Sequence, residues 1–311
     1  MITLSAGLSY VDLHFEGTPR VIATAVLRGA GGVALIDPGP SSTLPVLKAS
    51  LERAGIVIAD LTALLLTHVH LDHAGASGSL VRENPKLKVY VHAKGAPHMF
   101  NPEKLVASAT RLYGDAMDRL WGEILPVPEG ALVIVQGGEQ IKEGGRSLDV
   151  AYTPGHASHH VSYFVRDAGI AFVGDTAGLK LTPHGKVLPP TPPPDIDLEA
   201  WRESLRCIEG WQPRTLFLTH FGPAAPLGPH LGELLENLDA VSRLAKASLD
   251  REAADEEREA WFVAEWRREL RQRMDETDVR RYEVAGRFDL SWRGLARYWR
   301  KKETQQSTSG N

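Results

Sequence analysis

Cysteine is nearly absent from this chain of 311 residues, because Cys207 stands alone. A single thiol cannot form an internal disulfide, which excludes a small secreted scaffold held together by disulfides. Cys207 falls within the apolar pattern of "LEAWRESLRCIEGW". That position predicts a buried structural thiol and not a nucleophile.

Long hydrophobic runs are also missing. No stretch reaches the roughly 18 apolar residues typical of a membrane span, so we expect no membrane partner. The first residues, "MITLSAGLSYVDLHFEGTPR", lack a basic segment followed by a continuous apolar one. They favour a strand over a signal peptide, and we therefore expect a cytoplasmic protein.

An excess of basic residues is the third absence, since the formal net charge is -4. Nonspecific nucleic-acid binding depends on basic surfaces that neutralise phosphates, so no nucleic-acid partner is expected. By contrast, 43% of the residues are hydrophobic. A chain of this length and composition can bury a large core in one domain, or in one domain with an appendage.

Short apolar runs with β-branched residues alternate with glycine and proline turns in the first part of the chain. They predict strands within 21–29, 31–39, 61–68 and 87–93, with a helix over 42–55 that ends at Gly55. Further strand signals lie at 131–141, 147–156, 159–167, 170–178 and 215–222. Strands with intervening helices indicate a layered α/β arrangement.

Two segments depart from this alternation. Residues 94–125 are helical and rich in Met, Tyr and Trp, and they form an insertion within a domain over 1–222. Residues 223–303 form a charged, amphipathic helical extension, in which Phe262, Trp266 and Leu270 share one face suited to docking. A homo-oligomer could form through these helices. We expect 304–311 to be a disordered tail and Asp197 to cap a helix beginning at Leu198.

The two halves of the sequence correspond to each other. "VALIDPG" is similar to "IAFVGDTAG", and "LLLTH" is similar to "LFLTH", in the same order. This order favours two similar βα halves that face each other, although such short matches also arise by chance.

The stretch "HVHLDH" (68–73) concentrates three histidines and an aspartate after an apolar strand. His68 and His70, two apart in extended backbone, can point the same way, while Asp72 and His73 lie on the next turn. One segment can therefore supply ligands to two adjacent metals. Imidazole and carboxylate suit zinc and other first-row ions, and the absence of thiolates argues against a closed structural zinc site. The alternative, solvated turn residues, fits one histidine better than this concentration.

Three further candidates follow apolar runs elsewhere in the chain. They are His156 in "TPGH", Asp175 in "VGDT" and His220 in "LTH". A carboxylate such as Asp175 can bridge two cations, which a neutral imidazole cannot do.

"HVHLDH", "TPGH", "GDT" and "LTHFG", in this order, resemble the metallo-β-lactamase-fold hydrolase superfamily, specifically its glyoxalase-II, thioesterase and lactonase branch. The resemblance covers roughly residues 5–222 and implies an α/β (α+β) fold, a four-layer αββα sandwich. It implies that His68, His70 and His156 bind one divalent metal and that Asp72, His73 and His220 bind a second. Asp175 would bridge the two ions, which we expect to be zinc, with iron or manganese as alternatives. For Asp37 in "LIDPG", a role in supporting the ligands and a simple turn are both open.

The resemblance implies hydrolysis of an activated acyl bond (a thioester, lactone or similar ester) in a small organic substrate. A hydroxide shared by the two metals would attack the carbonyl carbon, with Asp72 orienting it or accepting its proton. Tyr113 in the insertion could donate to the developing oxyanion or could be a core aromatic. For His159 and His160, a structural role at the start of a strand is favoured over contact with the site or support of a ligand. His98 is assigned a surface or packing role. No basic cluster after His220 matches the glutathione-binding end of glyoxalase II.

Three other functions stay open at this stage. A dinuclear site also serves a phosphodiesterase or nuclease, which the acidic balance disfavours. A sulfur dioxygenase-like oxidoreductase on the same fold typically uses one iron, whereas this ligand set suits two metals. A non-catalytic binding module is disfavoured by the intact, open site.

Overall fold

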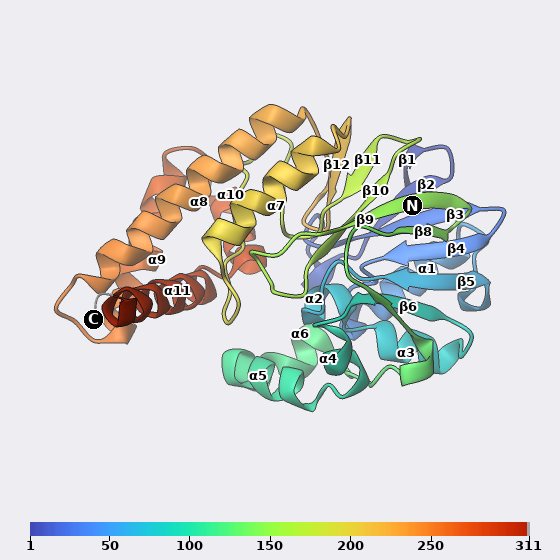
Figure 1. The fold of residues 1–311 in the computed structure, drawn as a ribbon, viewed down its shortest axis with the longest axis horizontal. Coiled ribbons are helices and arrows are strands. Elements are labelled where there is room, and N and C mark those ends of the chain that lie inside the picture. The colour runs from blue at the N-terminus through green and yellow to red at the C-terminus, as the bar shows by residue number, and fades with distance from the viewer. Residues whose placement is uncertain (310–311) are drawn as a thin grey trace.

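Two mixed β-sheets form the centre of the molecule (Figure 1). The computed structural model describes residues 1–309. In the first sheet the strands follow chain order, antiparallel from β1 to β4 and parallel from β4 to β7. These strands are β1 (Ile2–Ser5), β2 (Leu8–Asp12), β3 (Ala23–Gly29), β4 (Gly32–Ile36), β5 (Leu61–Leu65), β6 (Lys88–His92) and β7 (Leu132–Val135).

The second sheet has the order β13-β12-β11-β10-β9-β8. Only β11 and β12 run parallel in it, and the other neighbours are antiparallel. Its strands are β8 (Gln140–Glu143), β9 (Arg146–Tyr152), β10 (Val161–Val165), β11 (Ile170–Phe172), β12 (Thr215–Leu218) and β13 (Gly222–Ala224).

Side-chain alternation along the strands creates the layers. In β4, Ala34 and Ile36 belong to the core between the two sheets, while Val33 and Leu35 belong to the core beneath the outer helices. Successive strand residues point to opposite faces, so each apolar strand serves both cores. Helices α1 (Leu44–Glu52) and α3 (Ser77–Glu83) add buried residues to the outer core, and α7 (Leu198–Gly210) packs on the second sheet. The predicted four-layer αββα sandwich is confirmed.

The correspondence between the two halves is visible in the strand pairing. β4 runs parallel to β5, and β11 runs parallel to β12. Asp37 and Asp175 each follow the first strand of a pair, and His68 and His220 each follow the second. The prediction of two similar βα halves is therefore confirmed.

One predicted strand is in fact two. The run 131–141 divides into β7, which joins the first sheet, and β8, which joins the second. Gly137 and Gly138 both have φ of 96°, a backbone conformation that glycine adopts without strain. A Cβ at Gly137 would lie 2.4 Å from the backbone nitrogen of Tyr152. The chain crosses between the sheets at this glycine pair.

The prediction of a buried Cys207 is wrong, because its side chain is exposed. The inward face of α7 is formed by Trp201, Ser204, Leu205 and Ile208, all of them buried. Cys207 lies between Leu205 and Ile208 in sequence but off this face of the helix. At the start of α7, Asp197 accepts a hydrogen bond from Ala200 N, so its prediction as the cap is confirmed.

The insertion and the C-terminal extension are helical as predicted. The insertion contains α4 (Ala96–Phe100), α5 (Glu103–Tyr113) and α6 (Met117–Trp121), and the extension contains α8 (Leu227–Leu249), α9 (Asp255–Arg271), α10 (Glu276–Gly286) and α11 (Phe288–Ser309). Short elements complete the described chain: α2 (Leu71–Ala74) and the 3-10 turns Phe15–Gly17, Ser41–Thr43, Ile58–Asp60, Gly114–Ala116 and Glu129–Ala131.

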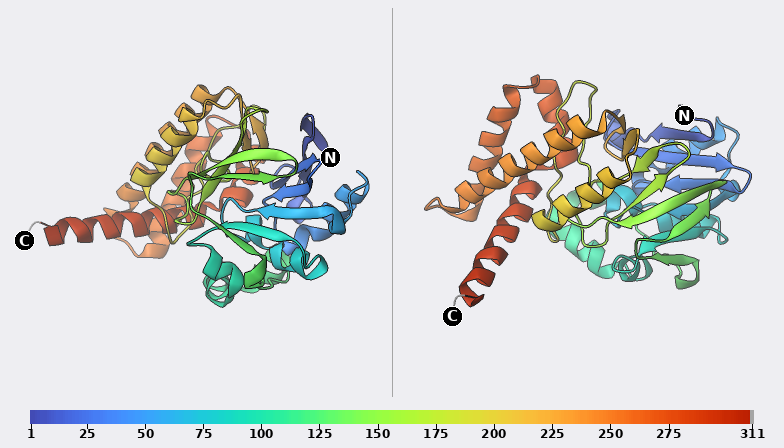
Figure 2. Two further views of the ribbon diagram at one scale, coloured as in Figure 1. Left: turned by 45° about the vertical axis from the view of Figure 1, so that its right-hand side comes forward. Right: turned by 45° about the horizontal axis from the view of Figure 1, so that its top comes forward.

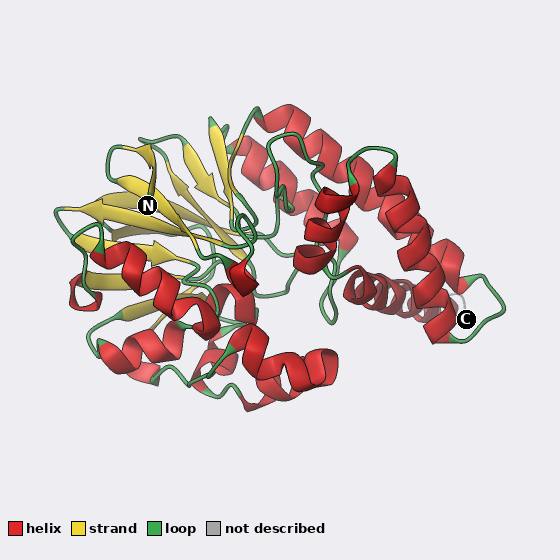
Figure 3. Ribbon diagram, turned by 180° about the vertical axis from the view of Figure 1, so that it is seen from behind, coloured by secondary structure: helices red, strands yellow, loops and turns green. Residues whose placement is uncertain are grey.

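The extension lies beside the sandwich (Figure 3), and its buried side chains belong to the same hydrophobic cluster as the core between the sheets. Phe262, Trp266 and Leu270 are buried, and the ring of Trp266 lies 4.2 Å from that of Phe288. The sheet continues past residue 222, since β13 pairs with β12. The far end of α11 projects from the body of the molecule (Figure 2).

The prediction of a disordered tail over 304–311 is wrong for most of these residues. Residues 304–309 continue α11 as helix, and 310–311 lie outside the described residues. Within the described chain, no helix combines the length and apolar character needed to cross a membrane.

Candidate metal centre

The centre lies where β5, β11 and β12 end. β5 stops at Leu65, and His68 and His70 follow in irregular backbone. His70, with extended backbone, is the N-cap of α2, so that Asp72 and His73 occupy the first turn of this short helix. One turn therefore presents two pairs of polar side chains from a rigid strand end.

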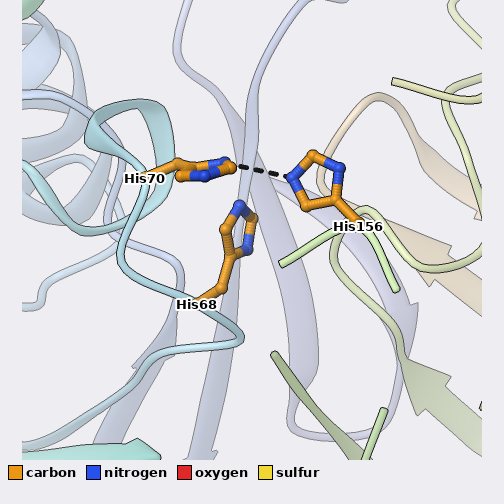
Figure 4. Close-up of side chains that lie close together, drawn as sticks. All are labelled: His68, His70 and His156. Carbon is orange, nitrogen blue, oxygen red and sulfur yellow. Dashed lines mark hydrogen bonds between the residues drawn. The ribbon is translucent and has the colours of Figure 1, made fainter. Parts of the chain in front are cut away.

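The first group of ligand atoms comes from His68, His70 and His156 (Figure 4). One nitrogen from each ring lies within 4.8 Å of the others. The closest approach is 3.0 Å, between His70 Nδ1 and His156 Nε2. Three imidazole nitrogens this close together can share one metal ion.

The second group comes from Asp72, His73 and His220. Asp72 Oδ2 lies 3.3 Å from His220 Nε2 and 3.7 Å from His73 Nε2. The two histidines are buried, whereas the Asp72 side chain keeps 24% exposure. Asp72 is therefore the member of this group that an incoming molecule can reach.

Asp175 lies between the two groups. Its Oδ1 is 3.2 Å from His73 Nε2 and 3.5 Å from His220 Nε2, both in the second group. Its Oδ2 is 3.4 Å from His156 Nε2, in the first group. Each carboxylate oxygen thus faces a different group, which is the arrangement a bridging carboxylate requires.

Buried polar atoms at the centre support a metal in this place. His68 Nε2, His73 Nε2 and Asp175 Oδ1 are buried and have no hydrogen-bond partner among the described residues. Buried polar atoms are normally paired, so such a cluster calls for a missing partner. A divalent cation supplies that partner, and the imidazole and carboxylate donors suit a first-row ion.

Backbone carbonyls orient two of the ligand histidines. His156 Nδ1 lies 2.8 Å from Pro190 O, and His220 Nδ1 lies 2.7 Å from Val21 O. Because a carbonyl only accepts, each Nδ1 must carry the proton. In the neutral form of each ring, the lone pair is therefore on Nε2, and both Nε2 atoms face other ligand atoms of the centre.

Asp37 performs the same task for His73. Its carboxylate is fully buried and lies 2.8 Å from His73 Nδ1. It also accepts hydrogen bonds from Thr67 N and Oγ1 and from Thr219 Oγ1, at 2.7 to 2.8 Å. Since Thr67 and Thr219 follow β5 and β12, this one carboxylate ties together the strand ends of both halves.

The charges of the centre are strongly coupled. Burial and the neighbouring histidines hold the pKa of His68 and His70 well below the usual value. Burial also opposes the charged form of His73, but Asp175, Asp72 and Asp37 outweigh it and raise its pKa well above the usual value. Burial raises the pKa of Asp72, but the neighbouring His73 and His220 lower it more strongly, so the pKa falls to about 2. Both carboxylates that would contact a metal are therefore ionised at neutral pH.

Two further histidines lie beside the ligands. His160 Nε2 accepts a hydrogen bond from Asp175 N at 3.2 Å and so supports the loop that carries Asp175. His159 and His98 line the cavity next to the centre. The alternative roles named for His159 and His160, contact with the site and support of a ligand, are therefore the ones the structure shows. The surface or packing role expected for His98 does not account for its place on the cavity.

A cavity of about 260 Å³ opens onto the centre and reaches His70, Asp72, His156, Asp175 and His220. Three separate segments enclose it: the helical insertion, the proline-rich loop 190–195, and the junction of α10 with α11 at 285–290. The C-terminal helices therefore line the candidate active site.

Tyr113 projects from the insertion into this cavity, and Arg287 faces it from the C-terminal extension. The Arg287 guanidinium lies 5.2 Å from the centre of the Tyr113 ring. Burial raises the pKa of Tyr113 well above its usual value, so its hydroxyl remains protonated at neutral pH. Lys94, Lys104 and Arg287 also line the cavity. The sequence offers no motif for these three, since they lie in three separate segments of the chain.

Comparisons with known proteins agree with this geometry. The family model described as Metallo-beta-lactamase superfamily matches residues 17–220. The metallo-beta-lactamase fold-containing protein ST1585 of Sulfurisphaera tokodaii is 30% identical over 222 residues, which are 70% of this chain and 80% of that protein. A hydroxyacylglutathione hydrolase of Aeromonas salmonicida is 31% identical over 151 residues, 49% of this chain and 44% of the relative. The match to this hydrolase thus spans less than half of its length.

Solved structures show the same fold over nearly the whole chain. The crystal structure of ST1585 from Sulfolobus tokodaii has a TM-score of 0.66 and 25% identity, covering 93% of this chain and 98% of that one. The metallo-beta-lactamase family protein TTHA1429 from Thermus thermophilus has a TM-score of 0.70 and 24% identity, covering 97% and 95%. With the family model matching about two thirds of the chain, this protein belongs to the metallo-beta-lactamase superfamily.

Proposed function

We propose that this chain is a dinuclear zinc hydrolase that cleaves an activated acyl bond, a thioester, lactone or similar ester, in a small organic substrate. The observation that carries the proposal is the position of Asp175, with one carboxylate oxygen toward each group of ligands. His68, His70 and His156 would hold one ion, and Asp72, His73 and His220 would hold the other. The ions, when bound, supply Lewis acidity at a substrate oxygen and lower the pKa of a bound water.

The chain's own residues suggest how the reaction is organised. Asp72 is ionised and partly exposed toward the cavity, so it can orient an attacking water. Its low pKa makes it a weak acceptor of the proton of that water. The protonated hydroxyl of Tyr113 can donate a hydrogen bond to the carbonyl oxygen as negative charge develops there. Burial of His68, His73, His156 and His220 keeps bulk water away from the ligands.

The acyl specificity rests on relatives. Hydroxyacylglutathione hydrolases are among the proteins that match this chain at about 30% identity, although over less than half of their length. Probable metallo-hydrolases from Bacillus subtilis and Methanocaldococcus jannaschii also match, at 36% and 30% identity. The names of all these relatives favour a hydrolytic reaction. The name hydroxyacylglutathione hydrolase also favours a thioester as the substrate.

The test combines metal analysis with a substrate screen. Protein purified without added metal should carry zinc and should hydrolyse thioesters or lactones faster than phosphodiesters. Asp175→Ala should lose metal and activity, while Asp167→Ala, at an exposed turn, serves as the matched control. One iron per chain with oxygen consumption would replace the proposal by an oxygenase, and a preference for phosphodiesters would replace it by a phosphodiesterase.

A further inference from the structure

Two neighbouring cavities reach the candidate metal centre. Both are lined by Asp72 and His220, and both are also lined by Tyr113 and Arg287. The second cavity has a volume of about 190 Å³. Because the two cavities share these lining residues, we treat them as two arms of one cleft that meet at the centre, next to the Tyr113–Arg287 contact.

The two arms differ in chemistry. The smaller arm is lined by apolar side chains, including Phe15, Val21 and Ile22. Glu16 and Arg119 also line this arm, and they form an ion pair in which their charges cancel. The larger arm extends instead toward Lys94 and Lys104. An apolar group suits the first arm, and a charged group suits the second.

Lys94 is positioned within the larger arm by Tyr152. Its Nζ lies 2.9 Å from Tyr152 Oη and 5.3 Å from the centre of that ring. The Tyr152 hydroxyl donates its proton in a hydrogen bond to Ser158 O at 2.8 Å. The same oxygen therefore accepts the hydrogen bond from the Lys94 ammonium group. Lys94 is thus held by a neutral phenol, which leaves its positive charge uncompensated.

The other charges of this arm are accounted for. Arg287 is neutralised by Asp289, with Nε and Nη2 at 3.0 and 2.7 Å from the carboxylate oxygens. Asp195 also lines this arm, and its carboxylate accepts a hydrogen bond from Ser158 Oγ at 2.5 Å. Lys104, on the first turn of α5, has no ion pair with a carboxylate of the described chain. Asp72 and Asp175 also line this cavity, but they belong to the candidate metal centre. Away from the centre, Asp195 is the one carboxylate of the lining that faces two lysines, and this leaves a net positive charge there.

We propose that Lys94 and Lys104 form a binding subsite for a negatively charged group of the substrate. Resting on the proposed function, this inference defines the substrate as an ester or thioester with two unlike ends. The smaller, apolar end lies in the arm beside Phe15 and Ile22, and the larger end carries a carboxylate or phosphate to the lysines. The bond to be cleaved lies at the junction, beside Asp72 and Tyr113.

The test uses butanoyl thioesters of mercapto-carboxylates of increasing length, each paired with the mercapto-alcohol of the same length. For the zinc-loaded wild-type protein, we expect the anionic member of each pair to have the lower KM once its chain reaches the lysines. Replacing both residues, Lys94→Gln with Lys104→Gln, should raise KM for that anionic thioester by about tenfold and leave the neutral one unchanged. The glutamate versions of both substitutions should reverse the preference. Lys142→Gln, exposed on β8 and away from both cavities, is the control.

A binding measurement separates this inference from the proposed function. Calorimetry with the thioether analogues, which cannot be hydrolysed, should show lysine-dependent binding of the anionic member only. Hydrolysis without any charge preference, or a preference that both substitutions leave intact, would overturn the subsite while the proposed function stands. Lysine-dependent binding without hydrolysis of any ester would support the subsite and count against the proposed function.

Discussion

At the scale of single residues, the centre is defined by atoms without partners. His68 Nε2, His73 Nε2 and Asp175 Oδ1 are buried and unpaired, and burying such groups costs free energy unless a ligand satisfies them. The second ring nitrogens of His73, His156 and His220 each have a fixed partner: Asp37, Pro190 O and Val21 O. The site is therefore oriented before any ion binds, which lowers the cost of binding.

Asp37→Asn tests this support. The amide is isosteric but uncharged, so His73 loses the carboxylate that orients it through Nδ1. We expect the affinity for the second metal to fall by about 10- to 100-fold. Competition with a chromophoric chelator measures it, with the exposed Asp115→Asn as the control. An unchanged affinity would show that Asp37 acts only in the turn after β4.

Metal binding should release protons. In the metal-free protein the carboxylates raise the pKa of His73 and His220, so both carry a proton at pH values where a free imidazole is neutral. A metal binds only the neutral ring, so affinity should rise with pH until these raised pKa values are passed. Calorimetry of zinc binding in buffers of different ionisation enthalpy reports the proton count. A count of zero at pH 7 would contradict the prediction.

At the scale of elements, the strand ends carry the site and the sequence reveals most of it. Apolar strands ending in "LTH" and "GDT" predict both the two similar halves and the ligands that follow the strands. The crossing at Gly137 and Gly138 could not be predicted, because a strand signal does not specify which sheet a strand joins. The role of the two lysines of the larger arm could not be predicted from the sequence either. Lys94 and Lys104 meet the metal centre only through tertiary packing, without a fixed spacing to any motif.

Aromatic side chains of the helical extension pack together at its end of the hydrophobic core. Phe262 is fully buried and packs against Trp266 at a ring distance of 5.6 Å. Phe262→Ala should lower the free energy of unfolding by about 3–5 kcal/mol, because it leaves a cavity. Denaturant unfolding measures this loss, and the exposed Glu269→Ala is the matched control. Equal stability of the two variants would mean that the helices pack more loosely than the structure shows.

At the scale of the whole molecule, the two halves of the sandwich and the added helices meet at one place. The first half supplies Asp72 and His73, the second supplies Asp175 and His220, and the α10–α11 junction closes the cavity beside them. Substrate choice on a shared fold then depends on the segments that enclose the cavity, not on the ligands. The insertion and the extension are those segments here.

The central claim is that Asp175 bridges two metal ions. Anomalous diffraction at the zinc edge, from crystals of the zinc-loaded protein, tests it most directly. We predict two peaks on opposite sides of the Asp175 carboxylate, one beside His68, His70 and His156 and the other beside Asp72, His73 and His220. A single peak, or a second peak away from Asp175, would contradict the claim.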